Sequence, residues 1–371
     1  MDPSTPSFYV NSRILGSGND STSTPLFYST NSSNDSDVSS LTPFSKATVV
    51  VYTMVFIVGF LGNTLAIYVV ARYAKVKTVT NIYILNLAVA DELYILGVPF
   101  IVTNSVLSYW PYGDFLCKVC MTVDTMSQFA STFCLTLMSI DRFLAVVYPI
   151  RSAKWRKPHM AKILSGMVWV VSFLTVLPVT IFSIVLEDLG TCNIRWPDPM
   201  KEVWSVIFIL YTSILGFFGP LVVISICYIF IVFKVKSVGA RAGLTKKRKS
   251  ERKVTRMVVI IVLVFVLCWL PFFTFNIVNQ FFTIPETQIT FITYFSLVIL
   301  TYVNSCANPV LYAFLSDNFK QSFQEVLCFR KPNTTMATSS KVDRHNGAKS
   351  VQMEVNRNPD SEPFTSKTVI V

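Results

Sequence analysis

Three acidic residues lie inside long apolar stretches of this 371-residue chain: Asp91, Glu92 and Asp124. A charge in such surroundings is costly and marks a function by default. Asp124 is the most informative of the three, because the apolar stretches offer no obvious Lys or Arg at its depth. An unpaired carboxylate in a low dielectric attracts a cation from outside. The alternative is that Asp124 makes only an internal hydrogen bond that helps helices to pack.

Helical spacing relates Asp124 to two further polar residues. Arg142 follows Asp124 by 18 residues, which corresponds to about five helical turns and about 27 Å. The two residues therefore share one face of a helix at opposite ends of a membrane span. Gln128 lies one turn from Asp124 on the same face, where it either extends a polar pocket or bonds a neighbouring helix.

The chain lacks the residues that several kinds of chemistry need. The only two histidines, His159 and His345, lie outside the apolar stretches, so no buried His can act as a base or a metal ligand. A retinal pigment needs a Lys in the last apolar stretch for its Schiff base, and residues 289–314 contain none. We therefore expect a binding protein and not an enzyme or a light sensor.

The elements that position these residues are expected to be membrane helices. Hydrophobic residues make up 52% of the chain and charged residues 14%, whereas soluble domains have a charged share of about 25%. A helix needs about 20 apolar residues to cross the hydrocarbon core. Seven such runs lie near residues 47–71, 82–107, 117–140, 162–186, 203–233, 254–282 and 289–314. We predict an all-α membrane protein with a seven-transmembrane helix bundle over residues 47–314.

The distribution of basic residues predicts the orientation of this bundle. Lys and Arg concentrate in loops that stay in the cytoplasm. They are dense after the first, third and fifth runs, most of all in residues 246–256, and sparse in the other connections. We expect a multi-pass plasma-membrane protein with its N-terminus outside and its C-terminus inside. The rival class is a transporter or channel, which would need a continuous polar path that the single layer at Asp91 hardly supplies.

Two of the eight cysteines are candidates for a disulfide. Cys117 and Cys192 both face the oxidising side of the membrane in the predicted topology. Cys120 lies one turn deeper and is a competing partner. A bridge between Cys117 and Cys192 would hold the loop before the fifth helix over Asp124.

Prolines fall inside five of the predicted spans, where each permits a kink. They are Pro99, Pro178, Pro220, Pro271 and Pro309. Pro271 stands two residues after Trp269 in the sequence CWLP. A bulky ring beside a weakened helix could couple ligand contact to bending, and simple packing is the alternative.

Short motifs give the chain a family resemblance. In order, they are Gly62-Asn63, LAVAD ending at Asp91, DRF at Asp141 to Phe143, Trp169, CWLP, and NPVLY at Asn308 to Tyr312. Over residues 47–328 the chain resembles the rhodopsin-like, or class A, G-protein-coupled receptors. The stretches MTVDTMSQF, KKRKSERKVTRMV and LTYVNSCANPVLYAFLSDNFKQSFQEVLC look very similar to those of somatostatin receptors.

The resemblance implies a receptor for somatostatin-like cyclic peptides that couples to inhibitory G proteins and lowers cyclic AMP. Opioid-type receptors share some of the motifs and are the alternative, but NSCANPVLYAFLSDNFK fits somatostatin receptors better. The implied ligand site comprises Asp124, Gln128, Phe272, Asn276 and Tyr302. In this site, a Lys of the peptide would pair with Asp124 and Gln128. The implied activation switch comprises Asp141, Arg142, Trp269, Pro271, Asn308, Pro309 and Tyr312.

The resemblance also implies an allosteric sodium ion. Its site would comprise Asp91, Ser131, Asn304 and Ser305. Two positions depart from the usual pattern of the family. Ser127 stands near the top of the sodium site where close relatives have Asn, and Phe143 replaces the Tyr that usually follows the Arg of the third helix.

Both tails carry signals for modification or binding. Residues 1–46 form a polar tail, and N-x-S/T sequons begin at Asn19, Asn31 and Asn34. Residues 315–329 predict a short amphipathic eighth helix on the inner leaflet, with Cys328 suited to palmitoylation. Residues 330–371 are expected to be disordered. Phosphates on their Thr and Ser residues would attract arrestin. The terminal TVIV could add a strand to a PDZ domain.

Overall fold

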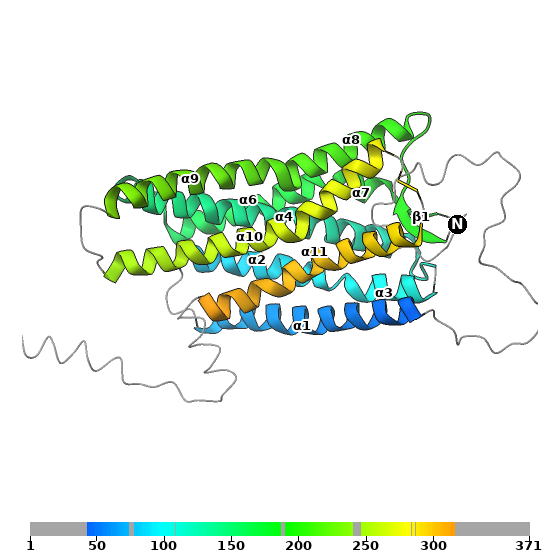
Figure 1. Cartoon of the computed structure of the whole chain (residues 1–371), viewed down its shortest axis with the longest axis horizontal. Helices are drawn as coiled ribbons and strands as arrows, with labels where there is room; N and C mark the ends of the chain where they lie inside the picture. Colours follow the sequence, from blue (N-terminus) through cyan, green and yellow to red (C-terminus); the bar gives the residue numbers. More distant parts are fainter. Residues whose placement is uncertain are drawn as a thin grey trace, which may run out of the picture. The chain divides into compact units, whose positions relative to one another are not determined.

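The computed structural model describes residues 43–73, 78–107, 109–186, 190–239, 246–282, 284–285 and 287–315, which form a helical bundle with one β-hairpin (Figure 1). The α-helices are α1 (Pro43–Tyr73), α2 (Val79–Ile95), α3 (Val98–Leu107), α4 (Gly113–Val147), α5 (Pro149–Ser152), α6 (Pro158–Thr175), α7 (Leu177–Phe182), α8 (Lys201–Ser213), α9 (Gly219–Gly239), α10 (Lys246–Phe281) and α11 (Gln288–Leu315). The strands are β1 (Ser183–Leu186) and β2 (Thr191–Ile194), and a π-helical turn, Ile214–Phe218, joins α8 to α9.

Six helical segments in this described part are long and apolar enough to cross a membrane. They are Lys46–Arg72, Val79–Asn104, Gly113–Val147, Lys201–Val235, Val258–Phe281 and Gln288–Leu311. These segments represent six of the seven predicted runs, although the second combines α2 and α3 and the fifth contains the π-helical turn. The fourth run, which a break also divides, is not among them.

The break in the fourth run lies at Val176, between α6 and α7. Pro178 has no N–H to donate to the carbonyl of Leu174, so regular helical bonding is interrupted there. Residues 158–182 together rise about 37 Å at the helical spacing, which is sufficient for a crossing. The expectation that this run stays helical to residue 186 was wrong. Its last four residues form β1, which pairs antiparallel with β2 from Ser183 opposite Ile194 to Leu186 opposite Thr191.

The other prolines predicted to bend helices act in two ways. Pro99 follows the break between α2 and α3 at Leu96 and Gly97, and Pro220 is the second residue of α9, two residues after the π-helical turn. Pro271 and Pro309 lie inside the continuous helices α10 and α11. The first pair therefore accompanies interruptions of helical bonding, as expected where an N–H is missing.

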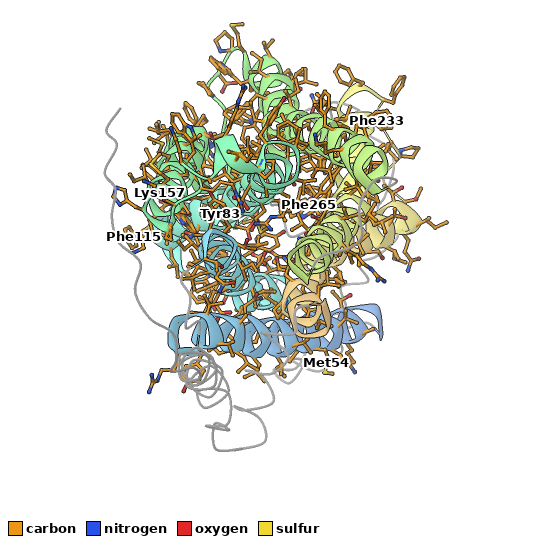
Figure 2. All side chains as sticks on the ribbon, turned by 90° about the vertical axis from the view of Figure 1, so that its left-hand side faces the viewer. Met54, Tyr83, Phe115, Lys157, Phe233 and Phe265 are labelled. Atoms are coloured by element: carbon orange, nitrogen blue, oxygen red, sulfur yellow. A yellow bond between two sulfur atoms is a disulfide. The ribbon has the colours of Figure 1, made fainter. Side chains whose placement is uncertain are left out.

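The bundle interior is assembled around α4. This helix buries eighteen residues, among them Asp124, Gln128, Asp141 and Arg142. It packs against α2, α6 and α9. Figure 2 shows the outer surface from one end: Met54 and Phe233 point away from the bundle, while Tyr83 and Phe265 lie inside it. An apolar surface of this kind suits lipid, so polar groups in the interior need a reason to be there.

Candidate functional site

A carboxylate with one hydrogen bond lies at the centre of the candidate site. Asp124 of α4 is only 9% exposed, and its Oδ1 accepts a bond of 3.3 Å from the Tyr302 hydroxyl on α11. No Lys or Arg among the described residues forms an ion pair with it. The break at Gly97 lets the α2–α3 backbone come close, since a Cβ at Gly97 would lie 3.4 Å from Asp124 Oδ1. The site therefore presents a buried anion that is not neutralised by a cation.

The nearest outward Lys on the same helix is already engaged. Lys118 lies between one and two turns from Asp124 on α4, and its Nζ donates to the carbonyl of Ile181 at 2.9 Å. That bond ties it to the end of α7 and away from the carboxylate. Within the described residues, Asp124 therefore has no cationic partner, as its depth in the apolar sequence suggests.

An aromatic chain connects Asp124 to the CWLP segment. The ring of Tyr302 stacks on Tyr94 with centroids 4.3 Å apart. Tyr94 lies 6.0 Å from Trp269, and Trp269 meets Phe272 edge to face at 5.9 Å. The hydroxyl of Tyr94 is fixed by a bond of 2.8 Å with Thr301 on α11. A change at Asp124 can therefore reach Trp269 through direct side-chain contact.

The remaining predicted ligand residues lie on α4 and α10 and make no side-chain hydrogen bond to Asp124 within the described residues. Gln128 is buried on α4, and its Nε2 lies 3.8 Å from where a Cβ of Gly216 would be. Gly216 belongs to the π-helical turn and leaves room for Gln128 and for the ring of Phe129. Asn276 donates its Nδ2 to the carbonyl of Phe272 at 2.8 Å. Of the five predicted ligand residues, Asp124 and Tyr302 form one bonded pair, and Phe272 and Asn276 form another.

A disulfide-anchored hairpin lies at the end of the bundle where α1 and α11 begin (Figure 1). The bridge joins Cys117 of α4 to Cys192 of β2, with Cα atoms 5.6 Å apart, and Cys120 is a free thiol. The predicted pairing is confirmed, and the competing partner is wrong. Asp114 adds a second tie, since its Oδ1 accepts the backbone N–H of Val185 at 2.7 Å.

Three donors surround Asp91 in the middle of the bundle. Ser131 and Ser305 donate to Oδ1 at 3.4 and 3.0 Å, and Asn308 donates to Oδ2 at 2.7 Å. Asn304 is buried on α11, and within the described part of the chain it makes no side-chain hydrogen bond to the carboxylate. A carboxylate with hydroxyl oxygens is the hard oxygen set that a cation such as sodium takes. Asn308, which the sequence placed in the activation switch, therefore also belongs to the surroundings of Asp91.

The opposite end of α4 carries a network of charges. The Nη2 atom of Arg142 donates both to Asp141 and, at 2.6 Å, to the hydroxyl of Thr80 on α2. Arg156 also binds Asp141 through Nε at 2.7 Å and Nη2 at 3.2 Å. In the sequence, Arg156 is one of the basic residues that follow the third apolar run. Nothing in its motif signalled the contact, which depends on the turn made by α5.

Several predicted residues lie outside the described part of the chain. They are Asn19, Asn31, Asn34, Cys328, the eighth helix at residues 316–329, the Thr and Ser cluster and the terminal TVIV. The backbone of Tyr312 lies within α11, but its side chain is not described.

Comparisons with known proteins agree with this arrangement. Residues 62–312 match the family model described as 7 transmembrane receptor (rhodopsin family). Somatostatin receptor type 5 of Rattus norvegicus is 58% identical over 302 residues, covering 80% of this chain and 83% of the relative. Type 2 of Mus musculus is 54% identical over 288 residues, covering 77% and 78%. Type 3 of Homo sapiens is 54% identical over 280 residues, covering 75% and 67%. The chain belongs to the rhodopsin family of seven-transmembrane receptors and, within it, to the somatostatin receptors' branch.

Proposed function

We propose that this receptor binds a somatostatin-like cyclic peptide and that its peptide carries a cation to Asp124. The observation that carries the proposal is the buried carboxylate, which has one neutral donor, Tyr302, and no ion pair with any residue that the structure describes. A Lys ammonium at Asp124 would form a charge-assisted hydrogen bond that solvent and salt screen little. The relatives named as somatostatin receptors support the class of peptide.

The same geometry suggests how binding outside is transmitted. A cation at Asp124 competes with the Tyr302 hydroxyl for Oδ1, and Tyr302 stacks on Tyr94, which in turn faces Trp269. Trp269 lies two residues before the helix-weakening Pro271. A ligand shifts an equilibrium only through different affinity for two states. The contact chain supplies such a difference, because the packing around Trp269 depends on where Tyr302 sits.

At the other end of α4, the Arg142 network is the proposed switch for the G protein. G-protein coupling is inherent to this family. We infer that Asp141 and Thr80 hold Arg142 in the resting state, and that the activated state releases it toward a G protein of the inhibitory class. This assignment requires the N-terminus outside and the C-terminus inside, as the distribution of Lys and Arg predicts.

Further features of the proposal concern regulation. A sodium ion at Asp91, Ser131, Asn304 and Ser305 would stabilise one state, with Asn308 as an additional neighbour. Glycans on the outer tail, a palmitate at Cys328, arrestin on a phosphorylated inner tail and a PDZ domain on TVIV remain predictions from the sequence.

Cells that express the chain test the function directly. Somatostatin should lower forskolin-stimulated cyclic AMP, and inactivation of inhibitory G proteins by pertussis toxin should abolish the effect. A response to opioid peptides without a response to somatostatin would assign the ligand to the alternative class. Ligand-dependent current or uptake in cells without G proteins would instead favour a channel or transporter.

A further inference from the structure

A buried amide near the outer end of α10 has no hydrogen-bond partner among the residues that the structure describes. Gln280 is 1% exposed, and neither its Nε2 nor its Oε1 makes a hydrogen bond within the described residues. Native proteins pair nearly all buried amides, because an unpaired one has lost its hydration without gaining a new bond. In the described part of the chain, Gln280 is the only side chain with two such unpaired buried atoms. The group therefore calls for a physical explanation.

The helical register places Gln280 on the same face of α10 as residues of the proposed ligand site. Gln280 follows Asn276 by about one turn and Trp269 by about three turns, so the three form one stripe along the helix. Trp269 is the inner end of that stripe, where it contacts Tyr94 and Phe272. Gln280 is the outer end, about 16 Å further along the helix by its rise per residue.

The neighbouring face of α10 is fixed against the hairpin end of the bundle. Ile277, about one turn before Gln280, packs against the buried cluster that contains Trp196, Phe208 and the disulfide. The backbone that carries Gln280 is therefore held in place, while a Gln side chain has several rotatable bonds. The amide can turn without movement of the helix.

We propose that Gln280 is a further peptide-recognition residue, whose amide pairs on binding with a peptide group that both donates and accepts hydrogen bonds. A backbone amide of the ligand or a side-chain amide has this chemistry, since one N–H and one C=O can be matched at once. The inference rests on the proposed peptide function and concerns ligand groups beyond the Lys. It would give selectivity, because a ligand without the matching group leaves the buried amide of Gln280 unpaired.

The test compares two Gln→Met variants of the full-length receptor in membranes. Gln280→Met keeps the length of the side chain and removes both polar atoms, and the matched control Gln288→Met makes the same change at an exposed residue of α11. Somatostatin is the probe. Gln280→Met should weaken its binding about tenfold, as expected for the loss of one paired amide. It should also raise the melting temperature of the ligand-free receptor, whereas Gln288→Met should leave both quantities unchanged.

A scan of the peptide separates recognition from folding. Each peptide amide is N-methylated in turn, and each side chain is replaced by Ala in turn. One change should weaken binding about tenfold on the parent receptor and have no further effect on Gln280→Met, which is the non-additivity of a direct contact. Unchanged somatostatin affinity in Gln280→Met, or an equal loss for every analogue, would overturn the proposal. Absence of specific binding to the parent receptor would instead refute the proposed function on which it rests.

Discussion

Replacing Asp124 with Asn removes the charge of the proposed ligand anchor while keeping its shape. At 9% exposure the carboxylate is largely shielded from solvent, and losing one partner of a desolvated charge pair costs about 2–5 kcal/mol. The Asn carbonyl can still accept a neutral hydrogen bond of about 1 kcal/mol. The net loss is therefore about 1–4 kcal/mol, equivalent to about 5-fold to 1,000-fold in affinity for a Lys-bearing peptide.

The assay is a binding cycle with two receptors and two peptides. The parent receptor and Asp124→Asn are each titrated with somatostatin and with an analogue in which the Lys is replaced by the neutral norleucine. Relative to somatostatin, the analogue should lose far less affinity on Asp124→Asn than on the parent receptor, because Asp124→Asn has already removed the contact. Surface expression of Asp124→Asn, measured with an antibody to the outer tail, controls for folding. Equal losses on both receptors would show that Lys and Asp124 act separately, and the proposed ligand site would have to be abandoned.

The remaining predictions concern the disulfide, the cytoplasmic end and the ion site. Cys117→Ser and Cys192→Ser should reduce radioligand binding to the same extent, and the double variant should bind no worse than either single variant. Additive losses would contradict a shared function of the bridge. Arg142→Ala should retain peptide binding, because residue 142 lies about 27 Å from Asp124. The peptide should no longer lower cyclic AMP through this variant, and normal signalling would refute the proposed switch. When sodium in the buffer is replaced by a large organic cation, the peptide affinity of the parent receptor should change. The peptide affinity of Asp91→Asn should stay the same. Retained sodium sensitivity in Asp91→Asn would place the ion elsewhere.

Hydropathy and helical spacing were sufficient to predict the bundle and the placement of Asp124. The apolar runs are long, and a helix of fixed rise relates Asp124 to Arg142 without knowledge of the other helices. The same reasoning could not find where a run stops being helical. Residues 183–186 are apolar enough to continue the fourth span, but pairing with β2 and the bond from Asp114 to Val185 make them a strand.

Contacts between residues of distant segments also could not be predicted from the sequence. Tyr94 was an ordinary aromatic residue of an apolar run until the fold placed it between Tyr302 and Trp269. The contact between Arg156 and Asp141 likewise depends on the turn of the chain through α5. Such contacts depend on how helices pack, which periodicity within a single helix does not encode. The break at Gly97 was suggested by Pro99, but its closeness to Asp124 was not.

Nucleotide exchange on a purified inhibitory G protein tests whether peptide binding at Asp124 activates the receptor. The full-length receptor is placed in lipid nanodiscs with the heterotrimer, and exchange of GDP for a GTP analogue is followed with and without somatostatin. We predict that somatostatin accelerates exchange on the parent receptor, and that the norleucine analogue does so only at much higher concentration. If somatostatin binds the receptor specifically but leaves the exchange rate unchanged, the receptor does not activate the inhibitory G protein as proposed.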